Sequence, residues 1–133
     1  MSAVLTTTAL TGRLAVGGTV VLLSSIAAER GSGGGSCGAA KAAVAAWNVD
    51  LSAELGARGI TANVVSPGFV ADTEFFHGRM TGERRKTLLN QTRNKREGRP
   101  DDIAETVFFL ASAGARHITG QVINVNGGAV TTR

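Results

Sequence analysis

GITANVVSPGFVADT, residues 59–73, has the pattern of a β-strand that follows the end of a helix and runs into a turn. Gly59 suits the left-handed conformation that commonly follows the last turn of a helix. The residues after it are mostly apolar and β-branched, which is typical of a strand buried on both faces of a parallel sheet. Pro67-Gly68 then favours a turn. We therefore predict a buried strand from Ile60 to Ser66.

Two further strands are predicted on either side of this stretch. Thr19 to Ser25 (TVVLLSS) is short, apolar and rich in strand-forming residues. Gln121 to Val125 is the second, and it ends at Gly127-Gly128. Both are short enough to be strands and too short to be typical helices.

Helical patterns separate the three strands. From Cys37 to about Ala57, apolar residues recur at steps of three and four, which indicates a helix with one buried face. A second helix begins at Pro100 and runs to about Ser112, because proline and acidic residues are favoured in a first turn. The recurring residues of the first helix are Ala40, Val44, Trp47, Leu51 and Leu55. We expect the second to turn Ile103, Val107, Phe108, Leu110 and Ala111 toward the core.

The remaining segments are less regular. We predict a helix over residues 2–16, ended by Gly17-Gly18, a loop over residues 26–36, and a basic helical stretch over residues 75–95. Alternating strands and helices predict an α/β fold with a parallel sheet and right-handed crossovers.

Composition narrows the class of protein. At 133 residues and 43% hydrophobic content the chain suits a single domain. Cys37 is the sole cysteine, so a disulfide framework and a cysteine-rich metal site are excluded, and a reducing cytoplasm is expected. The apolar run Val20 to Leu23 is far too short to cross a membrane. His77 and His117 lie in separate segments with no ligand pattern, so we expect no metal.

Positive charge is concentrated in one part of the sequence. The formal net charge is +4, and eight of the fourteen basic residues lie within residues 79–99. A solvated helix face and a surface that attracts an anionic ligand or partner are both compatible with this run. We do not expect nucleic-acid binding, since no aromatic residues interleave with these charges. The eight are Arg79, Arg84, Arg85, Lys86, Arg93, Lys95, Arg96 and Arg99.

Several motifs together resemble one family. The motifs that follow each other in the order and spacing of short-chain dehydrogenases/reductases are VVLLSS, CGAAKAAV, GITANVVSPGFVADT, GRPDDIAETVFFLAS and ITGQVINVNGG. The chain resembles the 3-oxoacyl-carrier-protein reductases of that family. The resemblance implies the C-terminal half of a Rossmann-like, doubly wound parallel sheet, with three strands and flanking helices. Residues 1–133 would form a single truncated domain that lacks the N-terminal dinucleotide-binding half. The family uses NAD(P), but we expect no cofactor to bind the isolated chain.

The resemblance also implies catalytic positions. Ser25, with Ser24 as the adjacent candidate, matches the serine that holds the substrate carbonyl, and Lys41 matches the lysine that supports the acid/base group. The family's tyrosine would lie four residues before Lys41, where this chain has Cys37, and the sequence contains no tyrosine. Residues i and i+4 share a helix face, so a cation there favours the deprotonated form of its neighbour. Cys37 is either an inert small residue or a reactive thiol.

The loop after the central strand resembles the family's nicotinamide-binding loop. The resemblance assigns backbone contacts to Pro67, Gly68 and Val70 and a hydroxyl contact to Thr73. An ordinary turn at a strand end is the alternative, because Pro-Gly pairs are common there.

Three hypotheses about function remain open. The first is a truncated short-chain dehydrogenase/reductase whose NAD(P)-dependent carbonyl/alcohol oxidoreduction is lost or depends on another chain. The second is a cofactor-independent lyase, cyclase, isomerase or hydrolase that reuses Ser25, Cys37 and Lys41 on a small-molecule substrate. The third is a non-catalytic assembly partner.

Self-association, or a complex with a chain that supplies the missing half, is also expected. Strand 19–25 would have an unpaired outer edge. In the family, the counterparts of helices 2–16 and 38–57 form a subunit interface, so an apolar face including Val44, Trp47 and Leu51 would otherwise be left in water.

Overall fold

The structure, a computed structural model, describes residues 1–31, 33, 35–76 and 78–132. The helices are α1 (Ser2–Leu10), α2 (Ala27–Arg30), α3 (Cys37–Gly56), α4 (Gly82–Gln91) and α5 (Pro100–Ala111). The strands are β1 (Thr19–Leu23), β2 (Thr61–Pro67) and β3 (Val122–Val125), and short 3₁₀ turns are η1 (Thr11–Arg13), η2 (Glu74–Phe76) and η3 (Ala113–Ala115). No helix in the described chain is both long and apolar enough to span a bilayer.

The three strands form one parallel sheet in the order β1-β2-β3. Thr19 of β1 is in register with Thr61 of β2, and Val64 of β2 with Val122 of β3. The predicted α/β fold with three parallel strands and flanking helices is therefore confirmed. All three strands and the helix from Cys37 lie within two residues of their predicted bounds.

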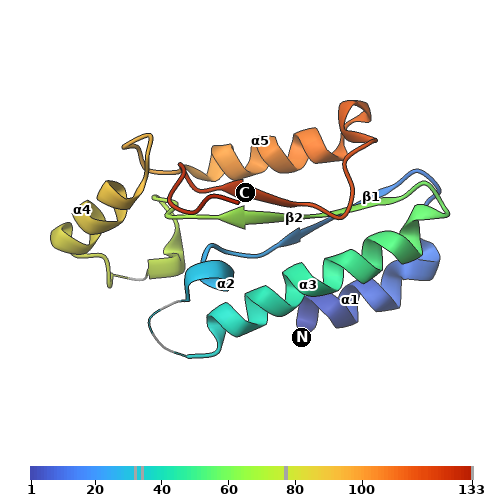
Figure 1. The fold of residues 1–133 in the computed structure, drawn as a ribbon, viewed down its shortest axis with the longest axis horizontal. Coiled ribbons are helices and arrows are strands. Elements are labelled where there is room, and N and C mark those ends of the chain that lie inside the picture. Colours follow the sequence, from blue (N-terminus) through green and yellow to red (C-terminus); the bar gives the residue numbers. More distant parts are fainter. Residues whose placement is uncertain (32, 34, 77, 133) are drawn as a thin grey trace.

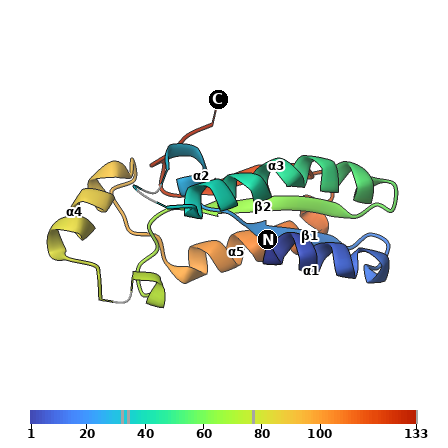
Figure 2. The ribbon, with the colours of Figure 1, turned by 90° about the horizontal axis from the view of Figure 1, so that it is seen from below.

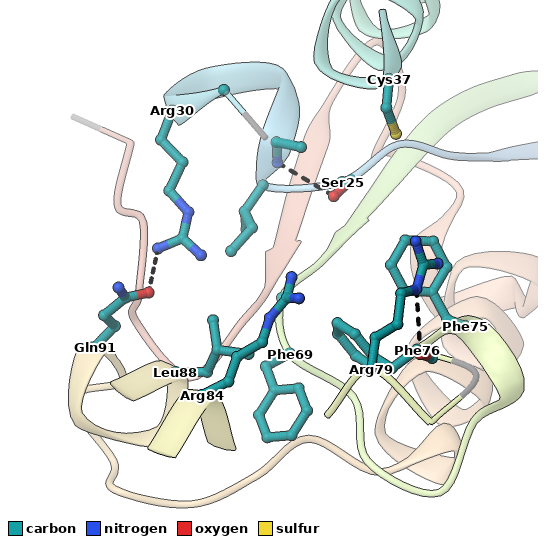
Figure 3. Close-up of a pocket in the computed structure, with 14 residues that line it drawn as sticks. Ser25, Arg30, Cys37, Phe69, Phe75, Phe76, Arg79, Arg84, Leu88 and Gln91 are labelled. Carbon is teal, nitrogen blue, oxygen red and sulfur yellow. Dashed lines mark hydrogen bonds between the residues drawn. The ribbon is translucent and has the colours of Figure 1, made fainter. Parts of the chain in front are cut away.

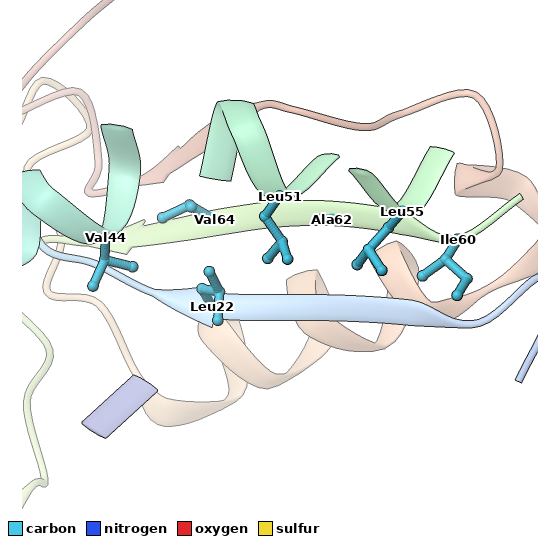
Figure 4. Close-up of a cluster of buried hydrophobic side chains, with 7 residues drawn as sticks. All are labelled: Leu22, Val44, Leu51, Leu55, Ile60, Ala62 and Val64. Atoms are coloured by element: carbon cyan, nitrogen blue, oxygen red, sulfur yellow. The ribbon is translucent and has the colours of Figure 1, made fainter. Parts of the chain in front are cut away.

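Helices cover both faces of the sheet (Figure 1), as a doubly wound fold requires. On one face α3 packs over β1 and β2, and this core is drawn in Figure 4. On the other face lies α5, whose Leu110 packs with Val65 of β2. The residues drawn in Figure 4 are Leu22, Val44, Leu51, Leu55, Ile60, Ala62 and Val64.

The prediction that both crossovers are right-handed is wrong for one of them. The chain moves in the same direction across the sheet from β1 to β2 and from β2 to β3, yet α3 and α5 lie on opposite faces. Two crossovers arranged in this way must have opposite hands. The connection from β2 to β3 also passes through η2 and α4, so it is not the compact strand–helix–strand unit to which the rule applies.

Three of the irregular segments differ from prediction. The helix predicted over 2–16 ends at Leu10, since the following carbonyls turn toward Arg58, which donates to Thr11 (2.7 Å) and Leu14. The predicted loop 26–36 contains the short helix α2, which starts where the Ala27 N–H donates to Ser25 Oγ (3.2 Å). In the described part of 75–95 the α-helix is limited to α4, which is capped by Thr81, whose side chain accepts from the Arg84 N–H (3.2 Å).

Two predictions about burial are also wrong. Phe108 is 74% exposed and Ala111 is exposed, because the buried stripe of α5 follows Ile103, Val107 and Leu110 at steps of three and four residues. Val44 and Leu51 are buried against the sheet and Trp47 is partly buried against the same core, since α3 uses its apolar face within this chain.

Exposed apolar groups lie elsewhere. The helix α1, drawn in dark blue in Figure 2, has no buried residue and leaves Leu5 and Leu10 in solvent. The outer edge of β1 pairs with no strand among the described residues, and Leu23 is 51% exposed there. These features agree with the predicted bare edge of the first strand.

Candidate active site

A cavity of about 560 Å³ opens beside the carboxyl ends of β1 and β2. This is the edge at which open α/β sheets bind ligands. All seven residues predicted from the sequence line the cavity, although they come from three separate segments. They are Ser25, Cys37, Lys41, Pro67, Gly68, Val70 and Thr73.

The end of β1 presents two adjacent serines that differ in their contacts. The Ser24 hydroxyl is buried and donates to the Lys41 carbonyl oxygen (2.9 Å), so it joins β1 to α3. Ser25 is half-buried, accepts a hydrogen bond from the Ala27 N–H, and lines the cavity. Because its O–H remains able to donate, Ser25 is the better of the two candidates for contact with a substrate oxygen.

Cys37 and Lys41 lie one turn apart at the start of α3. The Cys37 thiol is exposed, and the Lys41 ammonium donates to the Leu23 carbonyl oxygen (2.8 Å) at the end of β1. The start of α3 approaches α2 closely at Gly38, where a Cβ would lie 2.7 Å from the Ala27 carbonyl oxygen. Glycine at this position therefore allows Ser25 and Cys37 to line the same cavity.

The loop that follows β2 is held by backbone bonds on several sides. Pro67 accepts from the Ile26 N–H (3.0 Å), and Gly68 donates to the Val125 carbonyl oxygen (3.1 Å). Val70 forms a bridge with Gly98, and Thr73 Oγ1 lies 3.4 Å from the Val70 carbonyl oxygen. A Cβ on Gly68 would lie 2.6 Å from Asn126 Cβ, so the loop can cross the end of β3 only with glycine there.

Sequence reasoning missed the rest of the lining. Phe75 and Phe76 from η2 and residues from the start of α5 also line the cavity. A second cavity of about 460 Å³ adjoins the first and shares Ser25, Cys37 and Gly68 with it. The two adjacent phenylalanines in a polar stretch were the available signal in the sequence. The α5 residues are Pro100, Ile103 and Ala104.

Two ion pairs hold the basic segment near this wall. Arg85 bonds both carboxylate oxygens of Glu97 and lowers the pKa of Glu97. Arg96 donates to both oxygens of Asp102 (2.8 Å each), and Asp102 also accepts from the Arg99 N–H (2.7 Å). These hydrogen bonds, that of Arg96 first, lower the pKa of Asp102 to about 2.

No three His, Cys, Asp or Glu side chains gather among the described residues in the way that a metal site would require. His77, which is not expected from the sequence to be a metal ligand, lies outside the described residues. His117 is exposed in the connection that leads to β3.

Comparisons with known proteins agree with the motifs. The sequence profile of the family described as enoyl-(acyl carrier protein) reductase matches residues 1–130. The chain is 41% identical over 115 residues to a 3-oxoacyl-[acyl-carrier-protein] reductase of Haemophilus influenzae, covering 84% of this chain and 46% of that protein. It is 34% identical to the short-chain reductase protein NovJ of Streptomyces niveus, covering 84% and 44%.

Solved structures show the same relationship. The angucycline C-6 ketoreductase LanV with bound NADP superimposes with a TM-score of 0.77 at 33% identity, over 86% of this chain and 44% of that one. A short-chain dehydrogenase/reductase of Brucella melitensis gives 0.77 at 34% identity, over 90% and 46%. The chain thus spans less than half the length of these relatives.

Proposed function

We propose, from the premise that this chain belongs to the short-chain dehydrogenase/reductase family, that it forms the substrate side of an NAD(P)-dependent carbonyl/alcohol oxidoreductase site. In this proposal, turnover requires the nucleotide-binding half that its relatives possess. The observation that carries the proposal is the single cavity lined by both predicted groups of residues, Ser25, Cys37 and Lys41 on one side and the Pro67–Thr73 loop on the other.

The cavity suits the nicotinamide end of the nucleotide. Its volume of about 560 Å³ lies within the range of small-molecule sites. The loop backbone at Pro67, Gly68 and Val70 and the Thr73 hydroxyl would hold the nicotinamide, which supplies or accepts the hydride when bound. NADP is bound in the structure of the ketoreductase LanV, which aligns with 86% of this chain. The relatives of this chain are longer, and the residues that they have in addition would bind the remainder of the nucleotide.

The chain's own groups would orient the substrate. Ser25 would donate to the carbonyl oxygen, and Lys41 is anchored to the Leu23 carbonyl at the rim of the same cavity. Cys37 stands where the resemblance places the acid/base tyrosine, and a thiol is a shorter arm than a phenol. We therefore propose that proton transfer is the deficient step in this protein, a contribution worth roughly 10²–10⁴-fold in rate.

A fusion protein tests this proposal. The part of the Haemophilus influenzae reductase that precedes the matched region would be joined ahead of this chain, with Cys37 retained or changed to tyrosine. We expect both fusions to bind NADPH or NADH, and the Cys37→Tyr fusion to reduce simple ketones at least about 100-fold faster. Equal rates, or a folded fusion that binds no nucleotide, would contradict the proposal.

A second function is favoured by the exposure of Cys37, which lines both adjoining cavities together with Ser25. This arrangement supports a nucleotide-independent reaction with the thiol as nucleophile. An activity of the chain alone that iodoacetamide abolishes and Cys37→Ser removes would select this alternative.

A further inference from the structure

Three arginines from different segments surround the second cavity (Figure 3). Arg30 ends α2, Arg79 follows η2, and Arg84 lies in the first turn of α4. Figure 3 shows the Arg84 side chain extending from α4 toward the side of the cavity on which Ser25 lies. Only two of the three belong to the basic run of the sequence, and the fold brings Arg30 to them.

The three guanidinium groups are held in position without using most of their donors. Arg30 donates to Gln91 Oε1 (2.7 Å), which links α2 to α4. Arg79 Nε lies 3.4 Å from the Phe76 carbonyl oxygen, and the Arg84 guanidinium lies 5.6 Å from the centre of the Phe76 ring. Since a guanidinium carries five N–H donors, each can still bond an acceptor in the cavity.

Their charges are not balanced locally. The ion pairs recorded in the described residues are Arg85–Glu97 and Arg96–Asp102, and neither includes a cavity arginine. The described residues that line this cavity include no Asp or Glu. Because clefts lined by charge of one sign concentrate ions of the opposite sign, this cavity attracts anions.

The arginine-lined cavity adjoins the candidate active site directly. Ser25, Cys37 and Gly68 form part of the lining of both, as do Phe75 and Phe76. A molecule that places one group beside Ser25 therefore has its remaining atoms available to the arginines. A single molecule that carries both an anionic group and a carbonyl group could therefore occupy both cavities at once.

We propose that Arg30, Arg79 and Arg84 form an anion-binding lobe, and that the substrate is a carbonyl compound carrying a carboxylate or phosphate group. The guanidinium fork matches both groups, because it can donate two parallel hydrogen bonds to either of them. This inference rests on the proposed function, in which Ser25 contacts the carbonyl oxygen. It adds that the acidic group at the other end of the substrate selects which carbonyl compounds bind.

Calorimetry with matched ketones tests the lobe on the unmodified chain. Acetoacetate would be compared with its neutral ethyl ester, and dihydroxyacetone phosphate with dihydroxyacetone, all at low salt. We expect each anionic ketone to bind at least about tenfold more tightly than its neutral counterpart, as one charge-assisted hydrogen bond suffices for that ratio. The larger of the two ratios identifies carboxylate or phosphate as the preferred group.

Two variants on α4 distinguish binding by the cavity arginines from a general effect of positive charge on the surface. Arg84→Gln removes a cavity guanidinium, and we expect it to weaken binding of the anionic ketones about tenfold while leaving the neutral ones unchanged. Lys86→Gln removes an exposed charge of the same helix that does not line the cavity, and should change binding less than twofold. Circular dichroism would verify that both variants keep their helices.

Several results would overturn the inference. Equal binding of charged and neutral ketones, no binding of any of them, or equal losses from Arg84→Gln and Lys86→Gln would each do so. Inorganic phosphate that binds as tightly as dihydroxyacetone phosphate would show that the carbonyl compartment contributes nothing. The fusion experiment measures nucleotide-dependent turnover and this one measures binding without nucleotide, so the two proposals can fail separately.

Discussion

Gly68→Ala changes the residue on which the loop after β2 depends. Gly68 is where the chain leaves β2 and crosses Asn126, at the edge of the candidate active site. An added Cβ would lie 2.6 Å from Asn126 Cβ and 2.8 Å from its Cα, which is closer than real Cβ contacts allow. Backbone atoms are involved, so the loop must move away as a whole.

The expected cost follows from this overlap. Forcing an extra carbon into a packed site destabilises proteins by about 1–3 kcal/mol. Gly56→Ala is the matched control, since Gly56 lies in α3 with nothing within 4 Å of an added Cβ. Alanine there should stabilise the folded chain by about 0.4–1 kcal/mol, because it can adopt the helical backbone of Gly56 and restricts the unfolded chain. The same substitution is thus expected to change the free energy of unfolding in opposite directions at the two positions.

Urea unfolding followed by circular dichroism at 222 nm measures both changes. Gly68→Ala should lower the transition midpoint and Gly56→Ala should raise it, with the slope unchanged in each case. If Gly68→Ala were as stable as the wild type, the close approach of this loop to Asn126 would not exist in solution.

Four further predictions concern binding, catalysis, assembly and pH. Calorimetry should detect no NADH or NADPH binding to the chain alone with a dissociation constant at or below roughly 100 µM, about −5.5 kcal/mol, because in the proposed function the cavity holds the nicotinamide end alone. Cys37→Tyr by itself should not produce ketone-dependent NADPH oxidation, since the phenol would return without a bound hydride donor; measurable oxidation would refute this. Light scattering at low micromolar concentration should show a mass above 13.6 kDa, because the edge of β1 and the apolar side chains of α1 are exposed; a clean monomer with cooperative unfolding would contradict it. The pKa of Asp102 is lowered to about 2 in the folded chain, so its contribution to stability is present above its ordinary pKa near 4 and is lost as the pH falls toward 2; Asp102→Asn should reduce the loss of stability over that interval in acid titrations, and an unchanged pH profile would count against it.

The strands and the two long helices were predictable because their signals are local. Buried parallel strands are continuous apolar runs, and α3 repeats its apolar residues at steps of three and four. The short helix α2 was not predictable, since four residues give no periodicity and its start depends on the Ser25 hydroxyl. The end of α1 at Leu10 depends on Arg58, a residue distant in the sequence.

The candidate site was predictable only as far as the family motifs reach. Ser25, Lys41 and the Pro67–Thr73 loop could be proposed because their spacing matches known positions. The arginine-lined cavity could not be predicted, because Arg30 and Arg84 are far apart in the sequence and line one cavity only in the folded chain, where Arg30 of α2 bonds Gln91 of α4. The exposure of Phe108 was missed because a run of apolar residues in α5 does not by itself say where the buried stripe ends.

The parallel sheet has a consequence for how fast the chain can fold. Thr19 is paired with Thr61, forty-two residues away, and Asn63 bonds Gln121 across fifty-eight residues. Neither pairing can form before the intervening chain has been closed into a large loop, and the entropic cost of closing a loop grows with its length. Helix α3 can form early because its contacts are local, whereas the sheet requires the distant pairings that slow folding and prolong exposure of unpaired strands. A nascent chain of this kind is therefore most vulnerable to aggregation in the interval before β3 pairs with β2.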